Sequence, residues 1–128
     1  MTIIEAISKI DALNPNVYTQ SEKIGWLSTL DGIIKRQIID THEDGDSVVF
    51  NGYNNETPLD TELIAKEPYS DMYIDWLESK IGYYNGEIAK YNNSLTKFSD
   101  TYRDYKNNYN RIYMPKSTKI KWFGTRVR

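Results

Sequence analysis

The sequence feature that most constrains this chain is a long stripe of apolar and aromatic residues in its second half. The stripe begins after Pro68, where Ser70 could cap a helix. It consists of Tyr73, Leu77, Ile81, Tyr84, Ile88, Tyr91, Leu95, Phe98, Tyr102, Tyr105, Tyr109 and Ile112. From Leu77 onward the spacings alternate between four and three residues, which places the whole stripe on one face of a helix.

Two structures fit this stripe. Its phase is kept through Asn92-Asn93-Ser94, which favours one continuous helix over residues 70–112, kinked there if anywhere. Such a helix would be about 65 Å long at 1.5 Å per residue, longer than a compact domain of this size, so we expect part of it to pack on another subunit. The alternative is a pair of antiparallel helices that meet at Asn92-Asn93.

Two further helices are predicted in the first forty residues. Thr2 with Glu5, and Thr19 with Glu22, have the spacing of capping boxes, and an apolar face at helical spacing follows each pair. The second helix should end near Asp40. The sequence therefore predicts a mainly α-helical bundle, dominated by a long C-terminal helix or two consecutive helices.

The segment from residue 41 to residue 68 has a different character. Gly45, Gly52 and Pro58 interrupt any helical periodicity and favour turns. A small β-hairpin is expected in the 46–65 region, in which residues 47–50 pair with residues 61–64. A two-stranded hairpin is only marginally stable alone, so this one would need to pack on the helices.

The last fourteen residues are strongly basic. Residues 115–128, which we name the basic arm, contain five of the chain's 16 Lys and Arg residues and no acid. Residues 1–114 contain the other 11 basic residues and all 18 acidic ones. They therefore carry a formal charge of −7, against +5 in the arm. We therefore divide the chain into a helical domain, residues 1–114, and an extended arm, residues 115–128.

Three roles remain open for the basic arm: docking to another protein, contact with nucleic acid, and a solubilising end. Trp122 and Phe123 argue against a purely solubilising role. The residues that we expect to dock on a partner are Lys116, Lys119, Lys121, Trp122, Phe123, Arg126 and Arg128. A DNA-binding accessory protein that uses this arm is the alternative function.

The sequence offers little to catalysis or to metal binding. There is no Cys, and His42 is the single histidine. Residues 40–51 resemble a calcium loop in part, but the twelfth position is Asn51 instead of a bidentate Glu. We interpret His42 and its acidic neighbours as a solvated helix end and turn. We expect no enzyme activity, no catalytic, cofactor-binding or metal-binding residue and no cofactor, and we expect His42→Ala to leave function unchanged.

The composition predicts a reducing cytosol as the compartment. Without Cys the chain gives no sign of an oxidising environment. Charged residues interrupt the apolar residues near Met1, so no signal peptide is expected, and no stretch is long enough to span a membrane.

Aromatic residues on the long stripe suit a subunit interface, because they combine a large apolar area with a polar tip. The residues expected to pack between subunits are Tyr84, Tyr91, Phe98, Tyr102, Tyr105 and Tyr109. The other interpretation, that each of them belongs to the core of its own domain, remains open.

The order of several short motifs resembles that of the head-tail connector, or adaptor, proteins of long-tailed bacteriophages and prophages. These motifs are Leu13-Asn14-Pro15-Asn16-Val17-Tyr18, residues 23–31, Thr41-His42-Glu43, Asp60-Thr61-Glu62-Leu63, Pro68-Tyr69 with Tyr73, and residues 86–93. The likeness covers about residues 10–115 and consists of packing and turn patterns.

This resemblance implies a structural assembly protein of the virion that is made in the host bacterial cytoplasm. Such subunits form a ring, generally twelvefold, between the portal of the capsid and the tail, and DNA passes through the ring. The implied partners are other copies of the chain, the portal protein, and tail or head-closure proteins. The resemblance also maps the basic arm onto the C-terminal segment with which members reach the portal.

Overall fold

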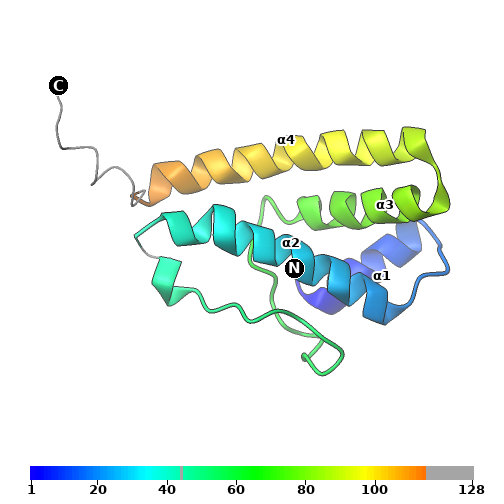
Figure 1. Ribbon diagram of the computed structural model, residues 1–128, viewed down its shortest axis with the longest axis horizontal. Helices are drawn as coiled ribbons and strands as arrows, with labels where there is room; N and C mark the ends of the chain where they lie inside the picture. The colour runs from blue at the N-terminus through cyan, green and yellow to red at the C-terminus, as the bar shows by residue number, and fades with distance from the viewer. Residues whose placement is uncertain (44, 115–128) are drawn as a thin grey trace.

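The computed structural model describes residues 1–43 and 45–114. This part of the chain forms four α-helices: α1 (Ile3–Leu13), α2 (Gln20–Gln37), α3 (Asp71–Asn85) and α4 (Ile88–Ile112) (Figure 1). Two short 3-10 helices, η1 (Ile39–Thr41) and η2 (Gly45–Ser47), follow α2. The prediction of a mainly helical bundle is confirmed. The basic arm lies outside the described residues.

The capping boxes at Thr2 and Thr19 form as predicted. Each threonine side chain accepts a hydrogen bond from a glutamate N–H three residues later, and that glutamate's side chain accepts one from the threonine N–H. These reciprocal bonds satisfy backbone donors that have no partner within the helix. α1 and α2 therefore begin where the sequence pattern places them.

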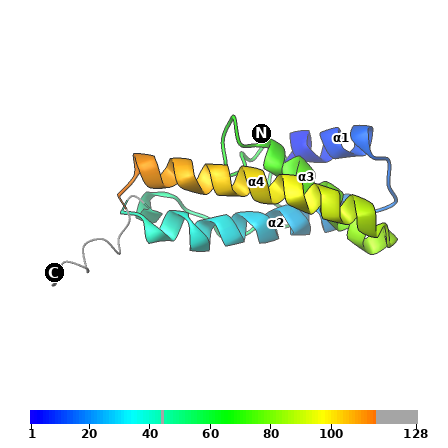
Figure 2. The ribbon, with the colours of Figure 1, turned by 90° about the horizontal axis from the view of Figure 1, so that it is seen from above.

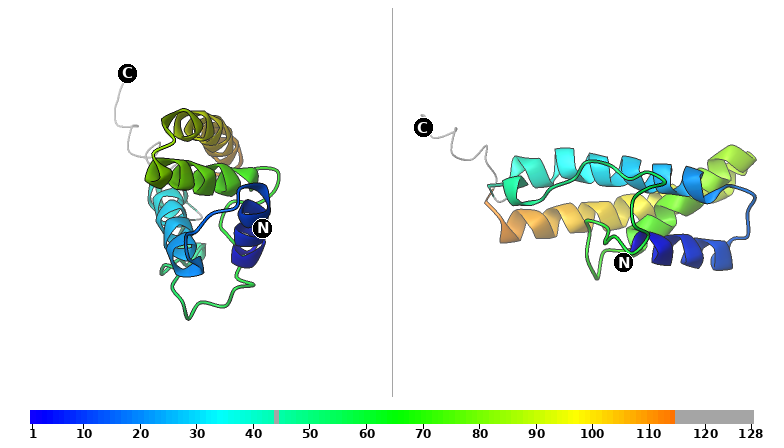
Figure 3. Two further views of the ribbon diagram at one scale, coloured as in Figure 1. Left: turned by 90° about the vertical axis from the view of Figure 1, so that its right-hand side faces the viewer. Right: turned by 90° about the horizontal axis from the view of Figure 1, so that it is seen from below.

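The core lies where α3 passes between two layers. α4 covers one side of α3, and α1 and α2 lie side by side on the other (Figures 1 and 3). The residues that fill this core have almost no exposed surface and include Ile3, Ile10, Leu27, Leu30, Ile34, Met72, Tyr73, Leu77 and Ile81. Burial of an aliphatic side chain of this size contributes about 1.5 to 3 kcal/mol, so this cluster holds the three layers together.

The long stripe is divided at Gly86, and the prediction of one continuous helix is wrong. Gly86 has a φ of 76°, and its N–H donates to the carbonyls of Gly82 and Tyr83. This left-handed residue ends α3 and reverses the chain, a conformation that glycine adopts without steric cost. The alternative of two antiparallel helices is confirmed, but Asn92-Asn93 lies inside α4.

The reversal removes the argument that a helix of this length must pack on another subunit. α4 has 25 residues and is about 37 Å long. Its first half packs antiparallel on α3, and its second half extends past the start of α3 toward the end of α2 (Figures 1 and 2). The helix fits within a single subunit, so its length no longer requires a second copy.

The predicted β-hairpin does not form among the described residues. Residues 47–50 contain no strand, and residues 61–64 lie against the N-terminus instead. Thr2 and Glu62 form an isolated antiparallel bridge, with Ile3 N donating to Thr61 O and Leu63 N donating to Met1 O. Ser70 also departs from the prediction, because its hydroxyl bonds to Glu67 instead of capping α3.

Gly86→Ala should lower the free energy of unfolding by about 1 to 2 kcal/mol, because an L side chain is disfavoured in the left-handed region. Space is not the cause, since no atom lies within 4 Å of the added Cβ. Gly25→Ala is the matched control: it also meets open space, but inside α2, and should stabilise by about 0.5 to 1 kcal/mol. Urea denaturation measures both variants, and effects of the same sign would contradict the assignment.

Candidate interaction surfaces

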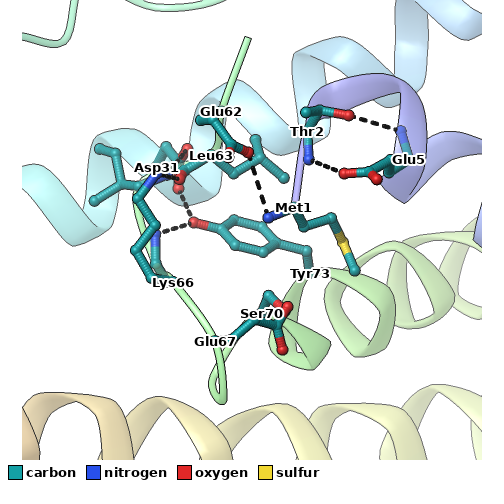
Figure 4. A network of polar contacts seen from close by, with 12 residues as sticks. Met1, Thr2, Glu5, Asp31, Glu62, Leu63, Lys66, Glu67, Ser70 and Tyr73 are labelled. Carbon is teal, nitrogen blue, oxygen red and sulfur yellow. Dashed lines mark hydrogen bonds and ion pairs between the residues drawn. The ribbon is translucent and has the colours of Figure 1, made fainter. Parts of the chain in front are cut away.

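A buried carboxylate joins three parts of the fold. Asp31 of α2 is fully buried and accepts hydrogen bonds from Tyr53 Oη and Tyr73 Oη, each at 2.5 Å, and from Ile64 N at 3.1 Å. Figure 4 shows the Tyr73 hydroxyl pointing at the Asp31 carboxylate. The same Oη accepts a hydrogen bond from Ala65 N at 2.7 Å. A buried charge is tolerated when its oxygens are satisfied in this way.

Burial raises the pKa of Asp31 above its ordinary value, while the hydrogen bonds from Tyr53 and Tyr73 oppose that rise. The pKa values of both tyrosines are also raised, chiefly by burial and then by the nearby Asp31 charge. The hydroxyl protons therefore stay on the tyrosines and are donated to the carboxylate. The network links α2, α3 and residues 53–65.

His42 is buried, so its interpretation as part of a solvated turn is wrong. Its Nδ1 lies 2.6 Å from the Ile38 carbonyl oxygen, and its Nε2 lies 2.8 Å from Asn110 Oδ1. The ring also meets Tyr109 edge to face, with centroids 4.7 Å apart. His42 thus connects the end of α2 to the last turns of α4, and its geometry assigns it a structural role.

The described residues contain no cluster of three or more side chains that could hold a metal ion. Over the same ranges, 1–43 and 45–114, none of the helices is sufficiently long and apolar to cross a membrane.

One end of the bundle exposes a group of aromatic rings. We name this surface the aromatic end; its residues are Tyr18, Trp26, Tyr83, Tyr84, Ile88 and Tyr91. Tyr84 stacks on Trp26 with centroids 5.7 Å apart and an interplanar angle of 9°. Tyr18 meets the same Trp26 ring edge to face and donates a hydrogen bond from Oη to Asn85 Oδ1. These contacts fix the rings across the α3–α4 turn and the start of α2.

The aromatic end remains open to solvent. Tyr83, Tyr84 and Ile88 are 56%, 58% and 59% exposed. The chain between α1 and α2 passes this end of the bundle (Figure 1), and Leu13 and Val17, in and after α1, are exposed. This solvent-facing group of large aromatic and apolar side chains is a candidate binding surface.

A groove of about 520 Å³ lies at the opposite end. One wall is the last part of α4, from Tyr105 to Tyr113, and the other consists of residues 47–49 and 62–69 with Ile39. Val49 and Ile112 are exposed on its walls. Beside it, Glu43 N donates a hydrogen bond to Met114 O at 3.0 Å, so the chain leaves the described body at this end.

The six aromatic residues that were expected to pack between subunits fall into two groups. Tyr105 and Tyr109 are buried in the core, while Phe98 and Tyr102 pack against it. These four contact their own subunit, as the other interpretation of the stripe allowed. Tyr84 and Tyr91 lie at the aromatic end, and more than half of the surface of Tyr84 is exposed to solvent.

The sequence did not single out Tyr18 or Trp26 as partners of Tyr84. Tyr18 and Trp26 come from a different helix and the loop before it, and only the fold brings them beside Tyr84. The docking residues proposed in the basic arm, from Lys116 to Arg128, lie outside the described residues.

Comparison with known proteins found no matching family model, no similar curated protein and no similar solved structure. The functional argument therefore rests on the residues and surfaces described above.

Tyr73→Phe should lower the free energy of unfolding by about 1 to 3 kcal/mol, because it leaves the Asp31 carboxylate and the Ala65 N–H buried without this hydroxyl. Tyr83→Phe, on the exposed side of the same helix, is the control and should change it by less than about 0.5 kcal/mol. Chemical denaturation measures both, and equal losses would contradict the network.

The raised pKa of Asp31 predicts a pH dependence of stability. The folded protein holds this proton more tightly than the unfolded chain, so the contribution is complete below the ordinary pKa of 3.8 and is lost as pH rises through the folded pKa. The difference in unfolding free energy, natural protein minus Asp31→Asn, should therefore shrink as pH rises through that window. Urea denaturation at several pH values tests this, and a difference that grows with pH would refute it.

Proposed function

We propose that this chain is a non-enzymatic structural subunit of the ring-shaped connector between the portal and the tail of a long-tailed bacteriophage or prophage. The observation that carries the proposal is the aromatic end, an exposed surface of mutually packed rings on a body that already has its own core. The order of the short sequence motifs, which resembles that of connector proteins, supplies the identity of the assembly.

The exposed residues of the aromatic end favour association between subunits. Aromatic side chains are enriched in protein interfaces, and burial of Tyr84, Tyr83 and Ile88 in a contact would remove apolar surface from water. A ring of more than two copies needs heterologous contacts, in which the aromatic end of one subunit meets a different surface of the next. The aromatic end replaces the long helix as the basis for self-association.

The division of charge fits a particle through which DNA passes. The helical domain is acidic and repels the phosphate backbone, which favours passage over tight binding. The basic arm would dock on the portal through its cations and through Trp122 and Phe123. The resulting protein belongs to the virion and assembles in the host bacterial cytoplasm.

The buried polar groups support a structural role. His42, a possible general base, and Asp31, a buried acid, are each enclosed by partners within the fold. Both hold elements of the subunit together, which a rigid component of a ring requires.

Ile88→Ser should weaken ring assembly by about tenfold per contact, since truncation of a central apolar interface residue commonly costs more than 1 kcal/mol. Lys106→Ser is the control: it changes an exposed position of the same helix that belongs to neither the aromatic end nor the groove. Sedimentation of the full chain with the portal protein measures assembly. Equal behaviour of the two variants, or monomers that never contact the portal at high concentration, would overturn the proposal.

The same preparation distinguishes the alternative of a DNA-binding accessory protein. If all five cations of the arm contacted phosphates, the logarithm of DNA affinity would fall with the logarithm of salt concentration at a slope of about −4.5. A connector subunit should show a much flatter response with DNA and keep its contact with the portal. A steep slope without portal binding would favour the alternative.

A further inference from the structure

The groove at the end of α4 lacks an occupant among the described residues. It lies where the chain leaves the body, because Ile112 and Tyr113 form part of its wall. The exposed apolar side chains there are Val49 at 80%, Ile112 at 62% and Met114 at 57%. Whatever fills the groove should therefore present apolar side chains and must reach this end of the bundle.

The charges around the groove favour a cationic occupant. Glu62, Lys66 and Glu67 line it, and the Met1 ammonium pairs with Glu62 at 3.4 Å, so the attraction for a cation comes from the −7 of the helical domain as a whole. The basic arm carries +5 with no acid and places Ile120, Trp122 and Phe123 between its cations. The arm therefore offers apolar side chains to the apolar lining of the groove and positive charge to an acidic domain.

The length of the arm suits a return path. If Pro115 took the second position of a turn, that turn would span residues 114–117 and the chain would be reversed by residue 118. Residues 119–123 could then run antiparallel to α4 for about 16 Å, at 3.3 Å per residue. The groove wall from Ile112 back to Tyr105 is about 10 Å long, at 1.5 Å per helical residue.

We infer that the groove is a docking site for the chain's own basic arm, with Ile120 and Trp122 against the apolar side chains of residues 47–49 and 63–64, and Lys121 and Phe123, which alternate with them, toward α4. Because the arm is attached next to the groove, its effective concentration there is in the millimolar range, and weak contacts are enough to hold it. An arm held in this way is withheld from other partners until one of them displaces it. The inference does not rest on the connector function, since it holds for any partner of the arm.

The cysteine-free sequence permits a direct test in the full chain. Asn108 lines the groove, while Asn107 precedes it on the same helix and is exposed outside the groove. If the arm doubles back after residue 118, residue 121 comes level with Asn108. Two variants are compared, Asn108→Cys with Lys121→Cys and Asn107→Cys with Lys121→Cys, and disulfide formation with oxidised glutathione is followed on non-reducing gels.

The expected result is an intramolecular disulfide that forms about tenfold faster in the Asn108 variant than in the Asn107 variant, because docking raises the local concentration of the arm at the groove. Changing Trp122 and Phe123 to Ser in the Asn108 variant should reduce its rate to that of the Asn107 variant. Equal rates in the two pairs, or a preference that survives loss of both aromatic residues, would overturn the inference. A covalent dimer in place of the intramolecular product would overturn it too, since the occupant would then be the arm of a second copy.

Discussion

The hydrogen bonds around Asp31 are the constraint on which the arrangement of the helices depends. The carboxylate comes from α2, one hydroxyl from α3, and the other hydroxyl and a backbone N–H from residues 53–64, which have no regular secondary structure. An ionised group at the centre of an apolar core is costly unless each partner is in place. The network thus fixes a long irregular segment that apolar packing alone would not position.

The described bundle combines two kinds of surface with this fixed interior. Tyr84 stacks on Trp26 at one end, and α4 forms a groove with residues 47–49 and 62–69 at the other. Both surfaces exist because α3 and α4 reverse at Gly86: the turn exposes its own aromatic residues, and the returning helix reaches the end of α2. A continuous helix would have separated these features, so the reversal defines the candidate sites as well as the fold.

Local signals in the sequence were sufficient for part of this structure. The threonine and glutamate pairs at the start of α1 and α2 act over three residues, so their pattern could be read directly. Gly86 could not be placed in the same way, because the apolar phase passes through it unchanged and each of the two helices continues the same stripe. Asp31 and His42 were also missed as structural residues, since their partners Tyr73 and Asn110 lie far away in sequence. A single aspartate among the apolar residues of α2 was the one available signal.

The hydrogen bond from Glu43 N to Met114 O fixes the point at which the chain departs from the bundle. It ties that point to the segment after α2, which His42 in turn anchors to α4. In any symmetrical assembly of identical copies, the points at which the chains leave their bundles would therefore be equivalent. Partners that bind beyond residue 114 would then be offered one attachment point per subunit, at a regular spacing.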